Sequence, residues 1–435
     1  MNNNPGAPVT GEDHYNRIVE QRLLIERATG GVHTNLSAAR RIGKTSIMRQ
    51  TIINLQKEGW IGIEIDFSSC KTIQEFVDRF TTKIQDAVDE ASPVRTKIDS
   101  AFKSLRNVFS RPITIEYDGV KTSVGAAGTT ADETKQLNAA LEDIGDVIDS
   151  LALSARAKRL IVGLDELPIF LTRFEQEAGN DADAQAARRR EISAILYSLR
   201  QLRQRNNTPV FWLHCSSVGL ESFVERLCLT HSLSGLQTFS LEAFSVEHTR
   251  ELLRELWRGK HKNSQMPEPV IEHIIARIGW LVPYYTQFMF HVLHEQMQFH
   301  ATPEAPTVSD VDKAYEKIVS ADYRKEFQPW YDRLDEQLGK HDGRLARVLI
   351  DKACGKATGL KASTLLNAAA AAQPAVDINE LEPQVRRMLG TLERDGYFAV
   401  RDDTYFMRSP LLRDYWRKHC ISIAIKRSLP KPKAK

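Results

Sequence analysis

The sequence predicts an α/β fold built on a parallel sheet, followed by a mostly helical second half. Four short segments have the apolar or alternating character of strands, and they cover residues 32–36, 61–67, 159–164 and 210–213. Helical patterns separate them, and strands that alternate with helices are typical of parallel sheets. From about residue 246 to about residue 395 the periodicity is that of helices.

The elements around these strands complete the expected first half. Helical patterns cover residues 12–29, 73–108, 133–157 and 191–205. Two short strands, in a segment that starts at Ile113, turn at Asp118-Gly119, which predicts a hairpin. Residues 176–190 are expected to form an exposed stretch before the last of these helices.

The composition is that of a soluble globular protein. The chain has 435 residues, of which 42% are hydrophobic and 26% charged, so two or three domains are expected. A net charge of +3 excludes a uniformly basic surface for nucleic acid. Five scattered cysteines without CxxC spacing indicate reduced thiols in a cytoplasmic protein rather than a zinc site. No apolar run is long enough for a signal peptide or a membrane span, so we expect no membrane partner.

Residues 38–45 read AARRIGKT, which fits the phosphate-loop pattern GxxxxGK[ST] except that Ala38 replaces the first glycine. A strand segment precedes the loop and an amphipathic helix follows it, so backbone N–H groups and a helix N-terminus meet at one anion site. Lys44 is expected on the β- and γ-phosphates and Thr45 on Mg²⁺, while Gly43 lets the backbone approach the phosphate. The residues expected to contact the nucleotide are Ala39, Arg41, Ile42, Gly43, Lys44, Thr45 and Ser46.

Two carboxylates follow the apolar strand of residues 159–164. Ligands gather at the carboxyl ends of parallel strands, so Asp165 and Glu166 are expected to face the loop. Asp165 would hold Mg²⁺ through water, and Glu166 would act as general base on the attacking water. Together with the loop, these carboxylates predict an ATP site that uses Mg²⁺.

Two further candidates for catalysis lie after the strand of residues 210–213. Ser217 would sense the γ-phosphate or orient the water, although a serine at this place can also simply begin a turn. Arg226 is the best candidate for an arginine finger, which would stabilise charge at the γ-phosphate bound by a neighbouring subunit. The alternative is that Arg226 forms a surface salt bridge. His214 and Cys215 are expected in or near the core.

The C-terminal part has the element order of a winged helix. Helical patterns at residues 344–353, 360–372 and 378–394 precede a hairpin at residues 397–409. Arg386 and Arg387 of the third helix could enter a DNA groove. That helix also carries Glu380, Glu382 and Glu393, which a DNA surface disfavours, so a protein-contacting or packing role stands beside DNA binding.

The run LSAARRIGKTSIMRQ resembles the phosphate loop of the prokaryotic archaeal-type ATPases, in the STAND branch near the AAA+ proteins, with Ala39 where proline is usual. LIVGLDELPIFL is similar to the second motif of that family, HCSSVGLE to its sensor strand, and PVTGEDHYNR to the segment that wraps the adenine. The segment GWLVPY at residues 279–284 resembles the glycine-and-proline motif of its helical lid, with a longer spacing than Gly-x-Pro. Pro283 would then contact the nucleotide, or it merely breaks a helix after a glycine.

The resemblance covers residues 8–425, with specific motifs in the first 290. It implies a P-loop NTPase parallel sheet of the RecA-like or AAA+-like type at residues 1–245, a helical lid at 246–325 and a winged-helix domain at 326–425. Residues 426–435 form a basic tail expected to be disordered. The resemblance also implies an ATP-driven switch of assembly state. Relatives of this layout serve in signalling, transposition and antiviral defence.

Three hypotheses about function follow. The first is an ATPase switch that assembles with copies of itself or with a protein partner. The second is an ATP-dependent loader or regulator that binds DNA through the winged helix. The third is a module that holds nucleotide without hydrolysing it, and an intact Glu166 argues against it. A GTPase is not expected, because the sequence has no NKxD segment.

Overall fold

The computed structural model describes residues 5–91, 115–117, 120–122, 130–154, 159–179, 181–205, 209–216, 219–261, 264–298 and 305–421. The chain divides into two compact units, which we describe separately. The sheet unit consists of Arg17–Ser37 and Ile47–Ser240, and the helical unit consists of Met1–Asn16, Ala38–Ser46 and Leu241–Lys435.

The sheet unit is built on a five-stranded parallel sheet, as the alternation of patterns predicts. Its strand order is β2-β5-β6-β1-β7. The strands are β1 (Thr34–Ser37), β2 (Ile61–Asp66), β5 (Leu160–Asp165), β6 (Val210–Ser216) and β7 (Gln237–Ser240). Because all five run in one direction, Ser37, Asp66, Asp165 and Ser216 end their strands at the same edge, with Ser37 beside Ser216 and Asp66 beside Asp165.

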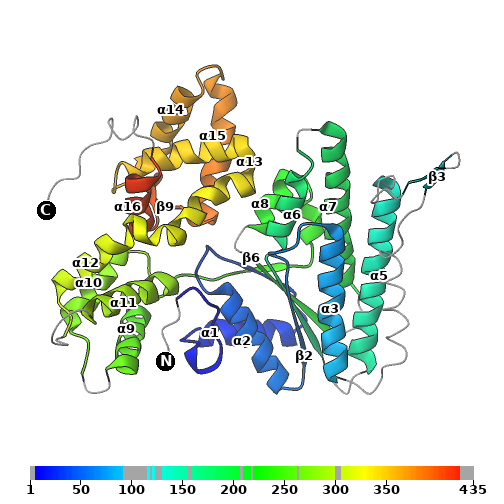
Figure 1. The fold of residues 1–435 in the computed structure, drawn as a ribbon, viewed down its shortest axis with the longest axis horizontal. Coiled ribbons are helices and arrows are strands. Elements are labelled where there is room, and N and C mark those ends of the chain that lie inside the picture. Colours follow the sequence, from blue (N-terminus) through cyan, green and yellow to red (C-terminus); the bar gives the residue numbers. More distant parts are fainter. Residues whose placement is uncertain are drawn as a thin grey trace. The chain divides into compact units, whose positions relative to one another are not determined.

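Helices cover both faces of this sheet (Figure 1). They are α1 (Ile18–Thr29), α2 (Lys44–Lys57), α3 (Ile73–Ala91), α5 (Thr130–Ser154), α6 (Leu167–Gln176), α7 (Ala182–Arg203) and α8 (Leu220–Arg226). On one face, apolar side chains of α3, α5, α6, α7 and α8 form one core with β2, β5 and β6. On the other face α2 lies so close that a Cβ on Gly62 would be 2.5 Å from Ile52 Cγ2. The glycine in β2 therefore permits the helix that follows the loop to sit directly on the sheet.

Several elements of the sheet unit differ from the expectation. Residues 182–190 form the first turns of α7, whose N-terminus is capped by the Asp181 side chain accepting from the Ala184 N–H at 2.7 Å. Helix α1 begins at Ile18 instead of residue 12, because Asn16 and Arg17 adopt left-handed backbone conformations with φ of 59° and 66°. Helix α6 and strand β7 are additional to the predicted elements.

The expected hairpin is present as β3 (Ile115–Tyr117) paired with β4 (Val120–Thr122). Its turn, Asp118-Gly119, lies outside the described residues, as does the part of the helix predicted beyond residue 91.

The part of the helical unit that follows the sheet starts with four helices: α9 (Val246–Lys260), α10 (Glu268–Ile278), α11 (Pro283–Met297) and α12 (Val308–Ile318). Helix α11 packs against the other three. Gly279 has a φ of 65°, and Pro283 is the first residue of α11, where a missing N–H costs no hydrogen bond. The GWLVPY segment thus lies between two helices, and the contact of Pro283 with the nucleotide stays a prediction.

The helices and strands from Arg324 onward form a winged-helix domain. It consists of α13 (Arg324–Cys354), β8 (Leu360–Lys361), α14 (Ala362–Ala372), α15 (Ile378–Arg394), β9 (Phe398–Arg401), β10 (Thr404–Met407) and α16 (Pro410–His419). Helix α13 kinks at Gly339, whose φ is 76°, and the strands form a small antiparallel sheet in the order β8-β10-β9. Asp402 and Asp403 turn the hairpin with positive φ values of 47° and 54°. Helix α16 was not expected from the sequence.

The parallel P-loop sheet, the helical lid and the winged helix of the predicted fold class are therefore all present. Among the described helices, none combines the length and the apolar character that crossing a lipid bilayer requires.

Candidate nucleotide-binding site

The loop of residues 38–43 leaves the end of β1 and leads directly into α2. The Lys44 ammonium is buried and donates to the carbonyl oxygens of Ala38 and Ala39 at 2.7 and 2.8 Å. Gly43 has a φ of +101°, a conformation that L side chains rarely adopt. The loop thus turns sharply around the lysine and opens onto the helix N-terminus, where backbone N–H groups favour an anion.

Arg41 occupies a strained position in the same loop. Its φ is +68°, which costs a non-glycine residue roughly 1–2 kcal/mol. Its guanidinium carbon lies 3.8 Å from the centre of the Tyr284 ring, and Nη2 lies 3.2 Å from Glu326 Oε2. The Tyr284 hydroxyl donates to the same carboxylate oxygen. Burial raises the pKa of Tyr284 above its ordinary value, and the Glu326 carboxylate adds to the shift.

The N-terminal segment lies against the beginning of α2. The backbone N–H of Val9 donates to Ser46 Oγ at 3.1 Å. Further along, the Tyr15 hydroxyl donates to Glu251 Oε2 of α9 at 3.2 Å, and its ring meets Phe244 edge-on at 6.0 Å between centroids. Burial and the neighbouring Glu251 carboxylate raise the pKa of Tyr15.

Between this segment and α9 lies a pocket with a volume of about 550 Å³, within the usual range for small-molecule sites. Its walls combine carboxylates, guanidinium groups, an imidazole, an amide and one aromatic ring. The lining residues are Glu12, His14, Tyr15, Asn16, Glu251, Arg254, Glu255 and Arg258.

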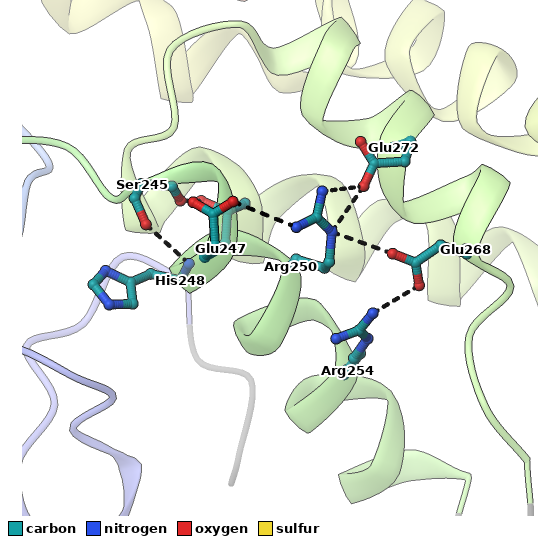
Figure 2. Close-up of polar contacts among 8 residues, drawn as sticks. Ser245, Glu247, His248, Arg250, Arg254, Glu268 and Glu272 are labelled. Atoms are coloured by element: carbon teal, nitrogen blue, oxygen red, sulfur yellow. Dashed lines mark hydrogen bonds and ion pairs between the residues drawn. The ribbon is translucent and has the colours of Figure 1, made fainter.

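An ion-pair network holds the α9 wall of the pocket against α10 (Figure 2). Arg250 contacts Glu268 at 3.2 Å and Glu272 at 2.6 Å, and Arg254 contacts Glu268 at 2.9 Å. Ser245 caps the start of the helix by accepting from the His248 N–H at 3.1 Å. One face of α9 is thus fixed to α10, while Arg254 and Arg258 reach the pocket.

The predicted acidic residues lie in the sheet unit, at the carboxyl ends of its central strands. Asp165 ends β5 and is buried. Glu166 follows with a φ of 56°, and its backbone N–H donates to the Cys215 carbonyl at 2.9 Å. Ser216 Oγ donates to Glu166 Oε2 at 3.4 Å, so the general-base candidate is oriented by the end of β6.

The structure adds polar residues to this edge of the sheet. Asp66 lies beside Asp165 in the register of β2 and β5. Arg49 of α2 donates to Glu64 at 2.7 Å, and this hydrogen bond raises the pKa of the Arg49 guanidinium, with smaller contributions from Asp165 and Asp66. The sequence did contain a signal for Asp66, because the strand pattern IGIEID also ends in a carboxylate.

The structure describes one of the two further candidates for catalysis, Arg226, but not the other, Ser217. Ser217 lies outside the described residues, and its neighbour Ser216 makes the contact with Glu166. Arg226 forms a bidentate ion pair with Glu175, at 2.9 and 2.5 Å, which is the salt bridge of the alternative interpretation. The finger role of Arg226 stays a prediction. His214 and Cys215 are buried, as expected, and burial lowers the pKa of His214.

The lid motif contacts the phosphate loop through Tyr284, a residue that the sequence analysis did not single out. Pro283 begins α11, and the next residue, Tyr284, carries the ring beneath Arg41. The Glu326 partner of Arg41 is 285 positions away in the chain, and no local pattern marks it.

No protein-family model and no curated protein matches the chain. Among solved structures, it is similar to the Walker-type ATPase of Pyrococcus abyssi, with 17% identity, a TM-score of 0.54, and coverage of 93% of this chain and 97% of that one. The Aeropyrum pernix ORC2 protein in its ADPNP–ADP complexes has 12% identity, a TM-score of 0.43, and coverage of 96% and 97%. The Aeropyrum pernix ORC1 protein in complex with DNA has 13% identity, a TM-score of 0.39, and coverage of 94% of each chain.

The first of these similarities extends over nearly the whole of both chains, through the sheet, the lid and the C-terminal domain. The protein therefore has the fold of a P-loop ATPase with a helical lid and a C-terminal winged helix.

Proposed function

We propose that this protein binds ATP with Mg²⁺ and hydrolyses it as a molecular switch that controls self-assembly or the binding of a protein partner. The buried Lys44 at the N-terminus of α2, enclosed by its own loop, is the observation that carries the proposal. The similarity to an archaeal Walker-type ATPase supports it. Signalling and antiviral defence are the processes that the sequence resemblance favours.

Each residue has a defined task in the proposed reaction, in which water attacks the γ-phosphorus and ADP and phosphate leave. Lys44 and the N–H groups of the loop bind the β- and γ-phosphate oxygens. Glu166 accepts the proton of the attacking water, and Ser216 orients the carboxylate through its hydroxyl. The Thr45 hydroxyl and the Asp165 carboxylate offer the hard oxygen ligands that Mg²⁺ prefers, and the ion would neutralise charge on the phosphates.

The pocket beside the N-terminal segment is the proposed place of the adenine base. Its Tyr15 ring offers a surface for stacking, and the wall beside the ring carries the polar amide of Asn16. The position agrees with the resemblance of residues 8–17 to an adenine-wrapping segment.

ATP turnover tests the proposal directly. We would compare the wild type with Lys44→Ala and Glu166→Gln, each with and without double-stranded DNA. Lys44→Ala should lose nucleotide binding, whereas Glu166→Gln should bind ATP and lose turnover by about 10²–10⁴-fold, the usual contribution of a general base. A wild type that binds ATP with turnover unaffected by either substitution would refute the assignment.

DNA binding is the alternative, and two ion pairs count against it. Arg386 of α15 is paired with Glu382 at 2.7 Å, and Arg387 with Asp342 at 3.3 Å. Both arginines would have to leave carboxylates in order to reach phosphates. Sedimentation with ATP in the absence of DNA should therefore show assembly, whereas DNA-stimulated turnover with a steep salt dependence would favour the regulator.

A further inference from the structure

Arg41 is held by residues from the far end of the chain. The Tyr284 ring of α11 supports one face of the guanidinium, and the Glu326 carboxylate of α13 accepts from its edge. Only 15% of the Arg41 side chain and 17% of the Glu326 side chain are exposed, so water screens this pair less than an ordinary surface pair.

A second contact joins the same loop to the winged-helix domain. Gly396, in the turn between α15 and β9, has a φ of +87°, and a Cβ there would lie 2.6 Å from Ala39 Cβ and 3.1 Å from Trp280. The turn can approach the loop only because residue 396 has no side chain. Loop residues 39 and 41 are therefore both engaged by the lid and the C-terminal domain.

The Glu326 carboxylate would compete with the phosphates of a bound nucleotide for Arg41. Arginine binds carboxylate and phosphate through the same planar set of N–H donors. Arg41 Nε is buried and has no hydrogen-bond partner in the part of the chain that the structure describes, so the guanidinium has donor capacity left. A phosphate group on the loop would attract Arg41, and Glu326 would oppose the exchange.

We propose that Glu326 and Tyr284 are positioning residues that form a nucleotide-sensitive latch on Arg41. Phosphate oxygens of the nucleotide replace the Glu326 carboxylate as the partner of Arg41, and the N-terminus of α13 is released from the loop. Binding of nucleotide to the phosphate loop thereby changes the contacts of α13, the first helix of the winged-helix domain. This inference rests on the proposed nucleotide binding and adds its regulation.

The affinity for ADP, measured by titration calorimetry on the full chain, tests the latch. Glu326→Gln keeps the shape of the side chain and removes the competing charge, so it should tighten ADP binding by about three- to tenfold. Tyr284→Phe keeps the ring and removes only the hydroxyl contact with Glu326, so a smaller change in the same direction is expected. Glu382→Gln is the matched control, because it removes an equally charged partner of an exposed arginine in α15 and should leave the affinity unchanged.

A double-mutant cycle separates the latch from a general effect of charge. In an Arg41→Ala background Glu326→Gln should no longer tighten binding, because the competition for Arg41 through which the latch acts has been removed. If Arg41 were a fixed structural pin, Glu326→Gln would weaken ADP binding or leave it unchanged. Either of these results, or equal tightening in the Arg41→Ala background, overturns the proposal.

Amide hydrogen exchange supplies a readout that does not depend on affinity. Saturating ADP should raise exchange at residues 324–332 of the wild type, and Glu326→Gln should show raised exchange there without nucleotide. Protection of this segment by ADP would contradict the latch. A wild type that binds no ADP would overturn both the proposed function and the latch, whereas binding without the Glu326 effect would overturn the latch alone.

Discussion

Replacement of Gly396 by alanine should destabilise the helical unit by an amount that follows from two contacts. A non-glycine residue at a φ of +87° costs roughly 1–2 kcal/mol. The new Cβ would lie 2.6 Å from Ala39 Cβ, and forcing a methyl group into a packed site typically costs about 1–3 kcal/mol. The free energy of unfolding should therefore fall by about 2–5 kcal/mol.

Scanning calorimetry on the full chain measures this change as a lower Tm for the transition of the helical unit. For a unit of roughly 200 residues, each kcal/mol corresponds to about 2–4 °C, so a decrease of about 4–20 °C is expected. Gly390→Ala is the matched control. Gly390 lies within α15, where the nearest side-chain atom to a new Cβ would be Arg394 Nη1 at 3.7 Å, an ordinary contact distance. Alanine there should stabilise by about 0.5–1 kcal/mol.

The double substitution Ala39→Gly with Gly396→Ala removes the Cβ–Cβ contact and retains the cost of the positive φ. It should recover about 1–3 kcal/mol relative to the single variant. The reasoning fails if Gly396→Ala unfolds at the wild-type temperature, or if Ala39→Gly recovers no stability, because the turn would then not press on the loop.

Two further predictions concern single side chains. Burial raises the pKa of Asp351 to about 6 from an ordinary 3.8, so the folded protein holds a proton that the unfolded chain loses, and stability falls as the pH rises from about 4 to 6. Asp351→Asn should therefore raise Tm at pH 7.5, by the equivalent of about 3 kcal/mol, and leave it nearly unchanged at pH 4; an equal difference at both pH values would contradict this. Ser216→Ala should lower the turnover of ATP by about tenfold with little change in affinity, because it removes the hydroxyl that orients Glu166; unchanged single-turnover kinetics would exclude that role.

Local patterns in the sequence were sufficient for the central strands and for the order of the domains. Buried parallel strands such as β5 and β6 are continuous apolar runs, and the loop before α2 carries a motif whose residue types follow from phosphate chemistry. Strand β7 was missed because it is an edge strand with a single buried residue, so QTFS lacks both an apolar run and an alternating pattern. Helix α7 began earlier than expected because its first turns are charged and exposed, which resembles a loop in composition.

The sequence by itself determined that a phosphate loop follows a strand, that two carboxylates follow another strand, and that a winged helix comes after the helical lid. Only the tertiary structure decided which groups surround the loop. Arg41 meets Glu326 across 285 positions, and Ala39 meets Gly396 across a greater separation. Periodicity records whether a side chain is buried but not which side chain it is buried against, and that choice depends on how distant helices pack.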